Sequence, residues 1–186
     1  QPVSLAHSDL ISPDRLAGIA ATTLEPWLVD RMRQGIGHFL IIPLFFGPSG
    51  ALTQAIPARI ARLNRNEGHL EVRLTAPLCP LPQGEPRLTA ILLNRIVTAA
   101  RETRLQPRRL VLVDHGSPSP EVNATRRWLA ADLRSRLEAG TQIEEAAMER
   151  RAGPQYDFNG ELLLAVLRRL ARADDQHFEA LGVGPC

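Results

Sequence analysis

Several residue types are scarce or missing from this sequence of 186 residues. It has no lysine, so all 22 basic side chains are arginines, and they face 20 acidic ones for a formal net charge of only +2. Two Trp, one Tyr and five Phe are its only aromatic residues. So small a charge with so few aromatics argues against a nucleic-acid-binding protein. The two cysteines cannot form a disulfide framework or a Cys-rich zinc site, so we expect a reducing, cytoplasmic location.

Long apolar runs are missing as well. The longest candidate, residues 39–46, contains a proline and is far shorter than the roughly 20 residues that a membrane helix needs. The sequence therefore predicts no association with a membrane. At 44% hydrophobic and 23% charged, it has the composition of a folded globular chain.

Short apolar runs alternate with longer segments of helical period. This alternation predicts an α/β protein with parallel sheets flanked by helices, because each parallel crossover needs a helix. The run at 38–44 (HFLIIPL) is apolar at nearly every position and predicts a strand buried on both faces. The predicted strands are 3–7, 38–44, 70–74, 109–113, 143–148 and one starting at 178; the predicted helices are 24–34, 56–63, 86–103, 121–138 and 161–173.

The two halves of the chain resemble each other. Residues 3–9 align with 143–149, residues 25–33 with 161–169, and, after a three-residue insertion, residues 38–45 with 177–184. Three matches in the same element types favour an internal duplication. We therefore predict two Rossmann-like lobes, 1–105 and 108–186. Both are expected to be incomplete: the first would lack its first strand, and the second would stop at its third.

One histidine follows the predicted strand with the clearest pattern. Asp114, His115, Gly116 and Ser117 come directly after residues 109–113 and precede a helix. Ligands bind at this edge of open α/β sheets, and a histidine there could bind a metal or act as a base. It could equally bond loop carbonyls. Ser117 is a candidate nucleophile, but no G-x-S-x-G motif surrounds it, and a helix-start role explains it as well.

Other candidates follow neighbouring strands. Glu149 ends the next strand and could share a cleft with His115, or form an ion pair with Arg150 or Arg151. Ser49 and Gly50 belong to a loop, FFGPSGAL, whose amides could hold an anionic group, although a simple turn explains the same residues. The aromatic loop at 156–159 is explained most simply by packing.

Three segments together resemble the class II tetrapyrrole chelatases, the sirohydrochlorin cobaltochelatases and ferrochelatases of the CbiX/SirB type. They are LVLVDHGSPSPEVN (110–123), AAMERRAGPQYDFNGELL (146–163) and LIIPLFFGPSGALTQAIP (40–57). The stretch at 76–96 is also similar to the segment before the last helix in that family. The resemblance covers most of the chain, as parts of two tandem lobes.

This resemblance implies a lyase of cobalamin or siroheme biosynthesis that inserts Co²⁺ or Fe²⁺ into a sirohydrochlorin-like tetrapyrrole, without an organic cofactor. His115 would then be the metal ligand and a proton acceptor, since imidazole suits first-row divalent metals. Glu149 would offset charge or relay the pyrrole protons. Gly116 and Ser117 would bind the substrate at the loop. Arg150 would bind a substrate carboxylate, because guanidinium groups bind carboxylates bidentately. Ser49 and Gly50 would bind the substrate in the other lobe. A homodimer that completes the site is also compatible with this picture.

The sequence departs from the family at its second histidine. That position falls on Ala51, and the aspartate that follows it falls on Ala55, so the first lobe lacks this ligand. In the second lobe the equivalent loop would follow Cys186. His7 matches no family ligand.

The sequence therefore predicts a metal chelatase whose active ligands lie in the second lobe, with the first lobe shaping the cleft. Its rival is a non-catalytic tetrapyrrole- or metal-binding protein on the same fold, which the lost histidine favours. A hydrolase that uses Ser117 is a third reading, but the sequence shows neither a base nor an acid for it.

Overall fold

The computed structural model describes residues 23–68, 70–173 and 181–183. The strand predicted at 3–7 lies outside this part of the chain, as do His7 and Cys186. The described residues form two compact units: one contains residues 23–43, 50–68 and 70–75, the other 44–49, 76–173 and 181–183. None of the described helices is long and apolar enough to cross a membrane.

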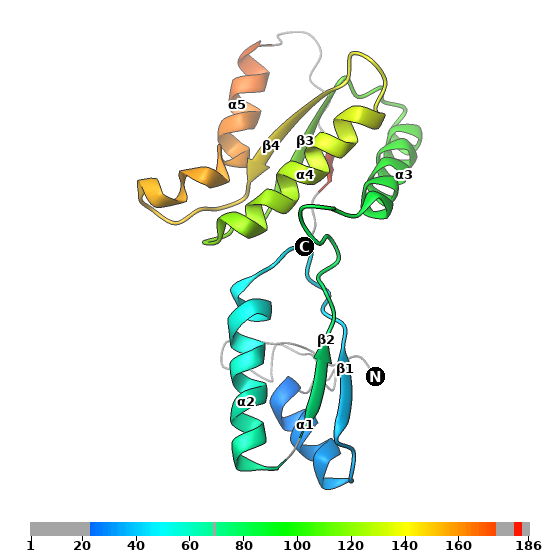
Figure 1. Ribbon diagram of the computed structural model, residues 1–186. Helices are drawn as coiled ribbons and strands as arrows, with labels where there is room; N and C mark the ends of the chain where they lie inside the picture. Colours follow the sequence, from blue (N-terminus) through cyan, green and yellow to red (C-terminus); the bar gives the residue numbers. More distant parts are fainter. Residues whose placement is uncertain (1–22, 69, 174–180, 184–186) are drawn as a thin grey trace. The chain divides into compact units, whose positions relative to one another are not determined.

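The first unit contains a two-stranded parallel sheet with helices. Its strands β1 and β2 pair in parallel, from His38 opposite Glu71 to Ile41 opposite Leu74. The Trp27 and Phe39 rings meet edge to face at 5.5 Å, so α1 packs on β1. Its elements are α1 (Leu24–Arg33), β1 (His38–Ile41), the short π-helix η2 (Ala51–Ala55), α2 (Ile56–Asn66) and β2 (Glu71–Leu74) (Figure 1).

Strand β1 differs from its prediction. The apolar run from residue 38 to 44 predicted burial on both faces, yet Leu40 is 64% exposed and Ile42 is 65% exposed. The regular strand also ends at Ile41. In the described part of the chain, β1 pairs with β2 alone and only the Phe39 face packs on a helix. An apolar sequence specifies what a strand can bury, whereas its neighbours decide what it does bury.

The second unit holds a three-stranded parallel sheet in the order β4-β3-β5. The sheet is parallel throughout: Arg109 to Asp114 pair with Gln142 to Ala147, and Leu110 to Leu112 pair with Leu181 to Val183. The predicted α/β class with parallel sheets flanked by helices is confirmed. The elements are α3 (Pro86–Thr103), β3 (Arg109–Asp114), α4 (Pro120–Arg136), β4 (Gln142–Ala147), the 3₁₀ segment η3 (Pro154–Asn159), α5 (Leu163–Ala173) and β5 (Leu181–Val183).

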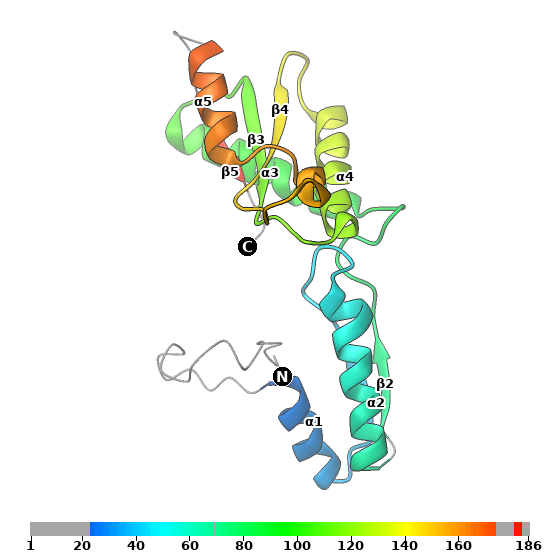
Figure 2. The same ribbon diagram turned by 90° about the vertical axis from the view of Figure 1, so that its left-hand side faces the viewer.

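Strand β3 separates two hydrophobic clusters, because successive side chains of a strand point to opposite faces. Leu110 and Leu112 pack with residues of α3 and α4, whereas Val111 and Val113 pack with residues of α5. Figure 2 shows α4 and α5 on opposite sides of this sheet. The first cluster contains Ile96, Leu110, Leu112, Leu129, Ala130, Leu133 and Ile143; the second contains Val111, Val113, Ala146, Val166 and Leu170.

Helix α4 buries the side that its apolar period predicted. Leu129 and Leu133 are 3% and 2% exposed, and Trp128 and Leu137 are partly buried against the same cluster. Helix α3 contributes Ile96 to this cluster and so packs within the second compact unit. The internal repeat predicts lobes at 1–105 and 108–186, and this division stays a prediction.

Candidate functional site

The site forms where β3 and β4 end side by side. Asp114 lies opposite Ala147, and the ladder continues beyond both strands. The amide of Met148 donates to the Asp114 carbonyl at 2.8 Å, and the amide of Glu149 donates to the His115 carbonyl at 3.1 Å. Parallel strands point the same way, so the residues after β3 and β4 meet at one edge of the sheet.

This register brings the two predicted catalytic residues together. His115 Nε2 lies 3.1 Å from Glu149 Oε1, and the two side chains are 72% and 71% exposed. Imidazole and carboxylate both bind first-row divalent metals, and both can take up a proton. The alternative, in which Glu149 pairs with Arg150 or Arg151, does not occur in the described part of the chain. Arg150 donates to Asp157 at 3.0 Å, and the Arg151 guanidinium lies 5.9 Å from the Tyr156 ring centre.

The loop after β3 requires its glycine. Gly116 has a φ of +94°, a conformation that favours glycine. A Cβ at this position would lie 1.9 Å from the Glu149 carbonyl oxygen, so a larger residue would push the two strand ends apart. The Gly116 amide also donates to Asp114 Oδ1 at 3.1 Å, which closes the turn around His115.

Ser117 is held by backbone contacts and by its own turn. Its amide donates to Asn159 Oδ1 at 2.9 Å, and Asn159 Nδ2 returns a bond to the Ser117 carbonyl at 2.9 Å. Its hydroxyl accepts a bond from the Ser119 amide at 3.0 Å, just before α4 begins. The Ser119 hydroxyl in turn bonds the Glu121 carboxylate and lowers its pKa. This geometry fits the helix-start reading of Ser117.

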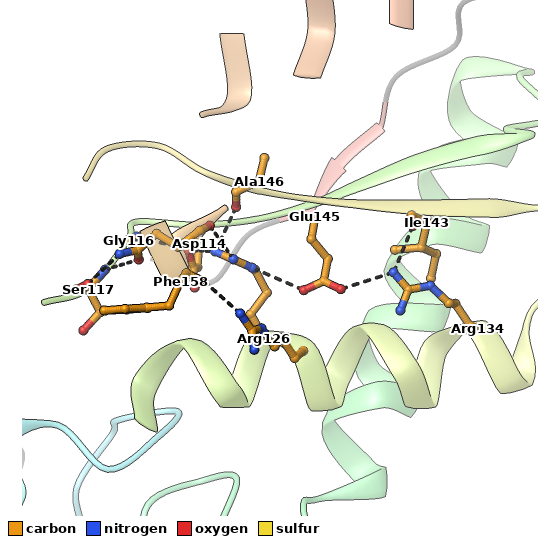
Figure 3. A network of polar contacts seen from close by, with 11 residues as sticks. Asp114, Gly116, Ser117, Arg126, Arg134, Ile143, Glu145, Ala146 and Phe158 are labelled. Atoms are coloured by element: carbon orange, nitrogen blue, oxygen red, sulfur yellow. Dashed lines mark hydrogen bonds and ion pairs between the residues drawn. The ribbon is translucent and has the colours of Figure 1, made fainter. Parts of the chain in front are cut away.

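A buried arginine lies behind the loop (Figure 3). Arg126 on α4 is 5% exposed, and its guanidinium forms an ion pair with Asp114. It also donates to the carbonyls of Ala146 at 3.2 Å and Asn159 at 2.8 Å. Its Nε lies 3.5 Å from Glu145 Oε2. One cation therefore contacts both strand ends and η3.

Sequence reasoning missed Arg126, although a signal was present. Leu129 and Leu133 mark the buried side of α4, and Arg126 precedes them by three and seven residues, which places it on the same side. A charged residue on an apolar helix face is rarely buried without a partner. The sequence attributes Asn159 to packing alone. In the structure it is 1% exposed, and its side-chain amide also forms two hydrogen bonds with Ser117.

A cavity of about 330 Å³ opens beside His115. Its walls are mostly apolar, and Ser49 is among them, while its predicted role in substrate binding stays a prediction. Gly50, its predicted companion, belongs to the other compact unit. Gly47 approaches α4 so closely that a Cβ there would lie 2.3 Å from Thr125 Oγ1. The lining residues are 44–47, Ser49, Leu112, 114–116, Val122, Thr125, Arg126 and Leu129.

At this edge, His115 and Glu149 are two described side chains of the types that can bind a metal, and they face each other. No group of three or more His, Cys, Asp or Glu residues gathers within the described part of the chain. Ala51 and Ala55, where the sequence resemblance predicts the family's second histidine and its aspartate to fall, lie on η2 in the first unit. His115 and Glu149 would thus leave most positions around a metal to water or to a macrocycle.

The fold is that of known chelatases. No protein-family model matches the chain, and no curated protein matches it. Among solved structures, it is similar to SirB from Bacillus subtilis with Fe³⁺, with a TM-score of 0.64 and 17% identity over 88% of this chain and 58% of that one. It is also similar to the sirohydrochlorin chelatase SirB from Bacillus subtilis subspecies spizizenii in complex with cobalt, with a TM-score of 0.56 and 15% identity over 88% of this chain and 68% of that one. The predicted CbiX/SirB-like fold is confirmed.

Proposed function

We propose that this chain belongs to a chelatase that inserts Co²⁺ or Fe²⁺ into a tetrapyrrole of the sirohydrochlorin type. One observation carries the proposal: His115 Nε2 and Glu149 Oε1 lie 3.1 Å apart at the carboxyl edge of a sheet with the SirB fold. The chain spans 58% of the length of the first of these structures, and the activity of the whole protein is part of the proposal.

The reaction exchanges one divalent metal for two pyrrole protons. His115 would bind the entering metal through its imidazole. As the metal passes to the macrocycle, the imidazole would take up one pyrrole proton and Glu149 the other, and both protons would then be released to water. Because both side chains are largely exposed, they can be reached without opening the fold. The metal is a substrate of this reaction, and no organic cofactor is needed.

Binding of the tetrapyrrole is assigned to the surroundings of this pair. Gly116 and Ser117 would border the macrocycle at the loop, and Ser49 would do so from the cavity. Arg150 could bind a substrate carboxylate, although it would then share its guanidinium with Asp157. The proposal also includes Gly50 as a substrate-binding residue. It further includes a cytoplasmic location and a homodimer that completes the site.

An absorbance assay tests this function with a matched pair of variants. Sirohydrochlorin is mixed with Co²⁺ or Fe²⁺ and the full-length protein, and metal insertion is followed by the spectral shift. His115→Ala should slow insertion by about 100-fold, because it removes the metal ligand and the proton acceptor. His38→Ala is the control, since His38 Nδ1 also lies 3.1 Å from a carboxylate, Glu71, but at the amino ends of β1 and β2. Insertion by His115→Ala at the wild-type rate would remove His115 from the mechanism.

The second candidate is a tetrapyrrole- or metal-binding protein without catalysis. The observation that favours it is the presence of only two metal-binding groups at the described site, with alanine at residue 51. In the same assay, a bound but unmetallated spectrum would support this reading. If no tetrapyrrole binds at all, both readings are wrong.

A further inference from the structure

His115 lies on a loop whose backbone is fixed on both sides. On the amino side, Asp114 Oδ1 accepts from the Gly116 amide and also faces Arg126. On the carboxyl side, Ser117 exchanges two bonds of 2.9 Å with the Asn159 amide group. The imidazole between these contacts is mostly exposed, so its position depends on the backbone that carries it.

Arg126 is the group that these contacts share. Its guanidinium reaches the Asp114 carboxylate, the Asn159 carbonyl and the Ala146 carbonyl of β4. Glu149 follows β4 three residues after Ala146. The same guanidinium is thus bonded to the loop of His115, to the strand that leads to Glu149 and to the η3 residue that holds Ser117 (Figure 3).

The burial of this cation argues for a geometric role. Replacing a buried ion pair by apolar residues is often neutral or stabilising, so stability alone does not account for an arginine on the apolar side of α4. A guanidinium is a rigid planar fork that bonds several acceptors at set directions, which lysine cannot imitate. The local charge is balanced: Asp114 and Glu145 face Arg126, and Arg134 donates to Glu145 at 3.2 Å.

We propose that Arg126 is a positioning residue that sets the separation of His115 and Glu149. The guanidinium holds the Asp114 carboxylate and the Asn159 backbone carbonyl, and these two residues hold the loop from which the imidazole projects. The placement of the pair follows from the contacts above, whereas its importance for metal insertion rests on the proposed function.

Arg126→Lys tests this role, and Arg134→Lys is its matched control. Both arginines lie on α4 and both face Glu145, but Arg134 bonds Glu145 and the Ile143 carbonyl, away from the loop of His115. Two measurements are made on the full chain: the nuclear Overhauser effect between the His115 ring and the Glu149 side chain, and the affinity for Co²⁺ from its visible absorption.

We expect Arg126→Lys to reduce the Overhauser intensity at least threefold and to weaken Co²⁺ binding about tenfold, within the 10–100-fold range for groups that orient metal ligands. Arg134→Lys should leave both within twofold of the wild type. A folded Arg126→Lys protein with wild-type Overhauser intensity would overturn the proposal. If no protein binds Co²⁺ but the Overhauser loss is confined to Arg126→Lys, the positioning role stands and the chelatase proposal loses support.

Asn159→Ala decides the question if Arg126→Lys does not fold. It removes both side-chain bonds to Ser117 but leaves the ion pair of Arg126 and the carbonyl that Arg126 bonds. We expect the same loss of Overhauser intensity in a protein with native far-ultraviolet circular dichroism. An unchanged Overhauser intensity would show that the hydrogen bonds between Asn159 and Ser117 do not position the imidazole. The proposal that Arg126 acts through Asn159 would then be wrong.

Discussion

Strands β1 and β3 have similarly apolar sequences but very different surroundings. In β3, residues 110–113 are all 7% exposed or less, whereas Leu40 in β1 is 64% exposed. Strand β3 is paired on both edges and packs on helices from both faces. Among the described residues, β1 is paired on one edge. The comparison shows that burial follows from the position of a strand in its sheet rather than from its own hydropathy.

The residues that follow these two strands also differ, because those after β3 are polar and those after β1 are apolar. After β3 come Asp114 and His115, and a buried guanidinium joins them to β4 and η3. After β1 the chain continues through apolar residues into the loop at 44–49. A polar network is stable behind β3 because α4 shields it from water and every charge in it has a partner. Four predictions test this contrast, and each compares a residue of the second unit with its counterpart.

The largest effect is expected at Arg126. Arg126→Met leaves Asp114 without its buried cation, and breaking a buried pair in this way typically costs about 3–5 kcal/mol. The counterpart is Arg62→Met in the first unit, where Arg62 and Glu25 form an ion pair with the guanidinium half exposed. Exposed pairs contribute little, so this variant should unfold like the wild type. Urea unfolding measures both; equal losses would remove the distinction between a buried and an exposed pair.

The next contrast concerns the strands themselves. Leu112→Ala in β3 removes a side chain that is 4% exposed and packs with α3 and α4 residues, and we expect a loss of about 2–5 kcal/mol. Leu40→Ala in β1 should change stability by no more than about 0.5 kcal/mol. The free energy of unfolding from denaturant titration checks both values. A large loss for Leu40→Ala would mean that its face is covered in solution.

A smaller difference is expected at two glycines with positive φ. Gly116→Ala and Gly35→Ala both place a side chain in a left-handed conformation, which costs about 1–3 kcal/mol. Only at Gly116 does the new Cβ meet backbone, 1.9 Å from the Glu149 oxygen, whereas nothing lies within 4 Å at Gly35. Gly116→Ala should therefore be the less stable protein and should weaken Co²⁺ binding, while Gly35→Ala keeps it. Thermal unfolding and Co²⁺ titration test this pair.

The smallest effect concerns the first turns of two helices. The Arg87 side chain and amide lower the pKa of Glu85, the N-cap of α3, to about 2, whereas Thr23 makes no side-chain cap bond at α1. A lowered folded-state pKa stabilises the protein above the ordinary pKa of about 4.3, and this contribution is lost as pH falls toward 2. Glu85→Gln should lower the melting temperature at pH 7 but not near pH 2. Thr23→Ala should leave it unchanged at both pH values. A deficit in Glu85→Gln that is the same at pH 7 and pH 2 would contradict this assignment.

Much of the candidate site could be predicted from local sequence. An apolar strand followed by Asp-His-Gly-Ser indicated the sheet edge, and the alternation of elements indicated that Glu149 would follow the neighbouring strand. What local sequence could not provide was the register that sets His115 beside Glu149, since pairing depends on contacts between distant segments. The same limit hid Asn159, whose partner Ser117 lies 42 residues earlier.

The sequence by itself determined the α/β class, the order of the described helices and strands from residue 24 onward, and the positions of the candidate chemical groups along the chain. Periodicity, helix starts and glycine stops are local properties, so they can be read residue by residue. The tertiary structure alone decided that β3 is buried while β1 is half exposed, that Glu149 faces His115 rather than an arginine, and that Arg126 is buried at the centre of the network. Each of these depends on which surfaces meet, because burial, pairing and desolvation are properties of contacts and not of single residues.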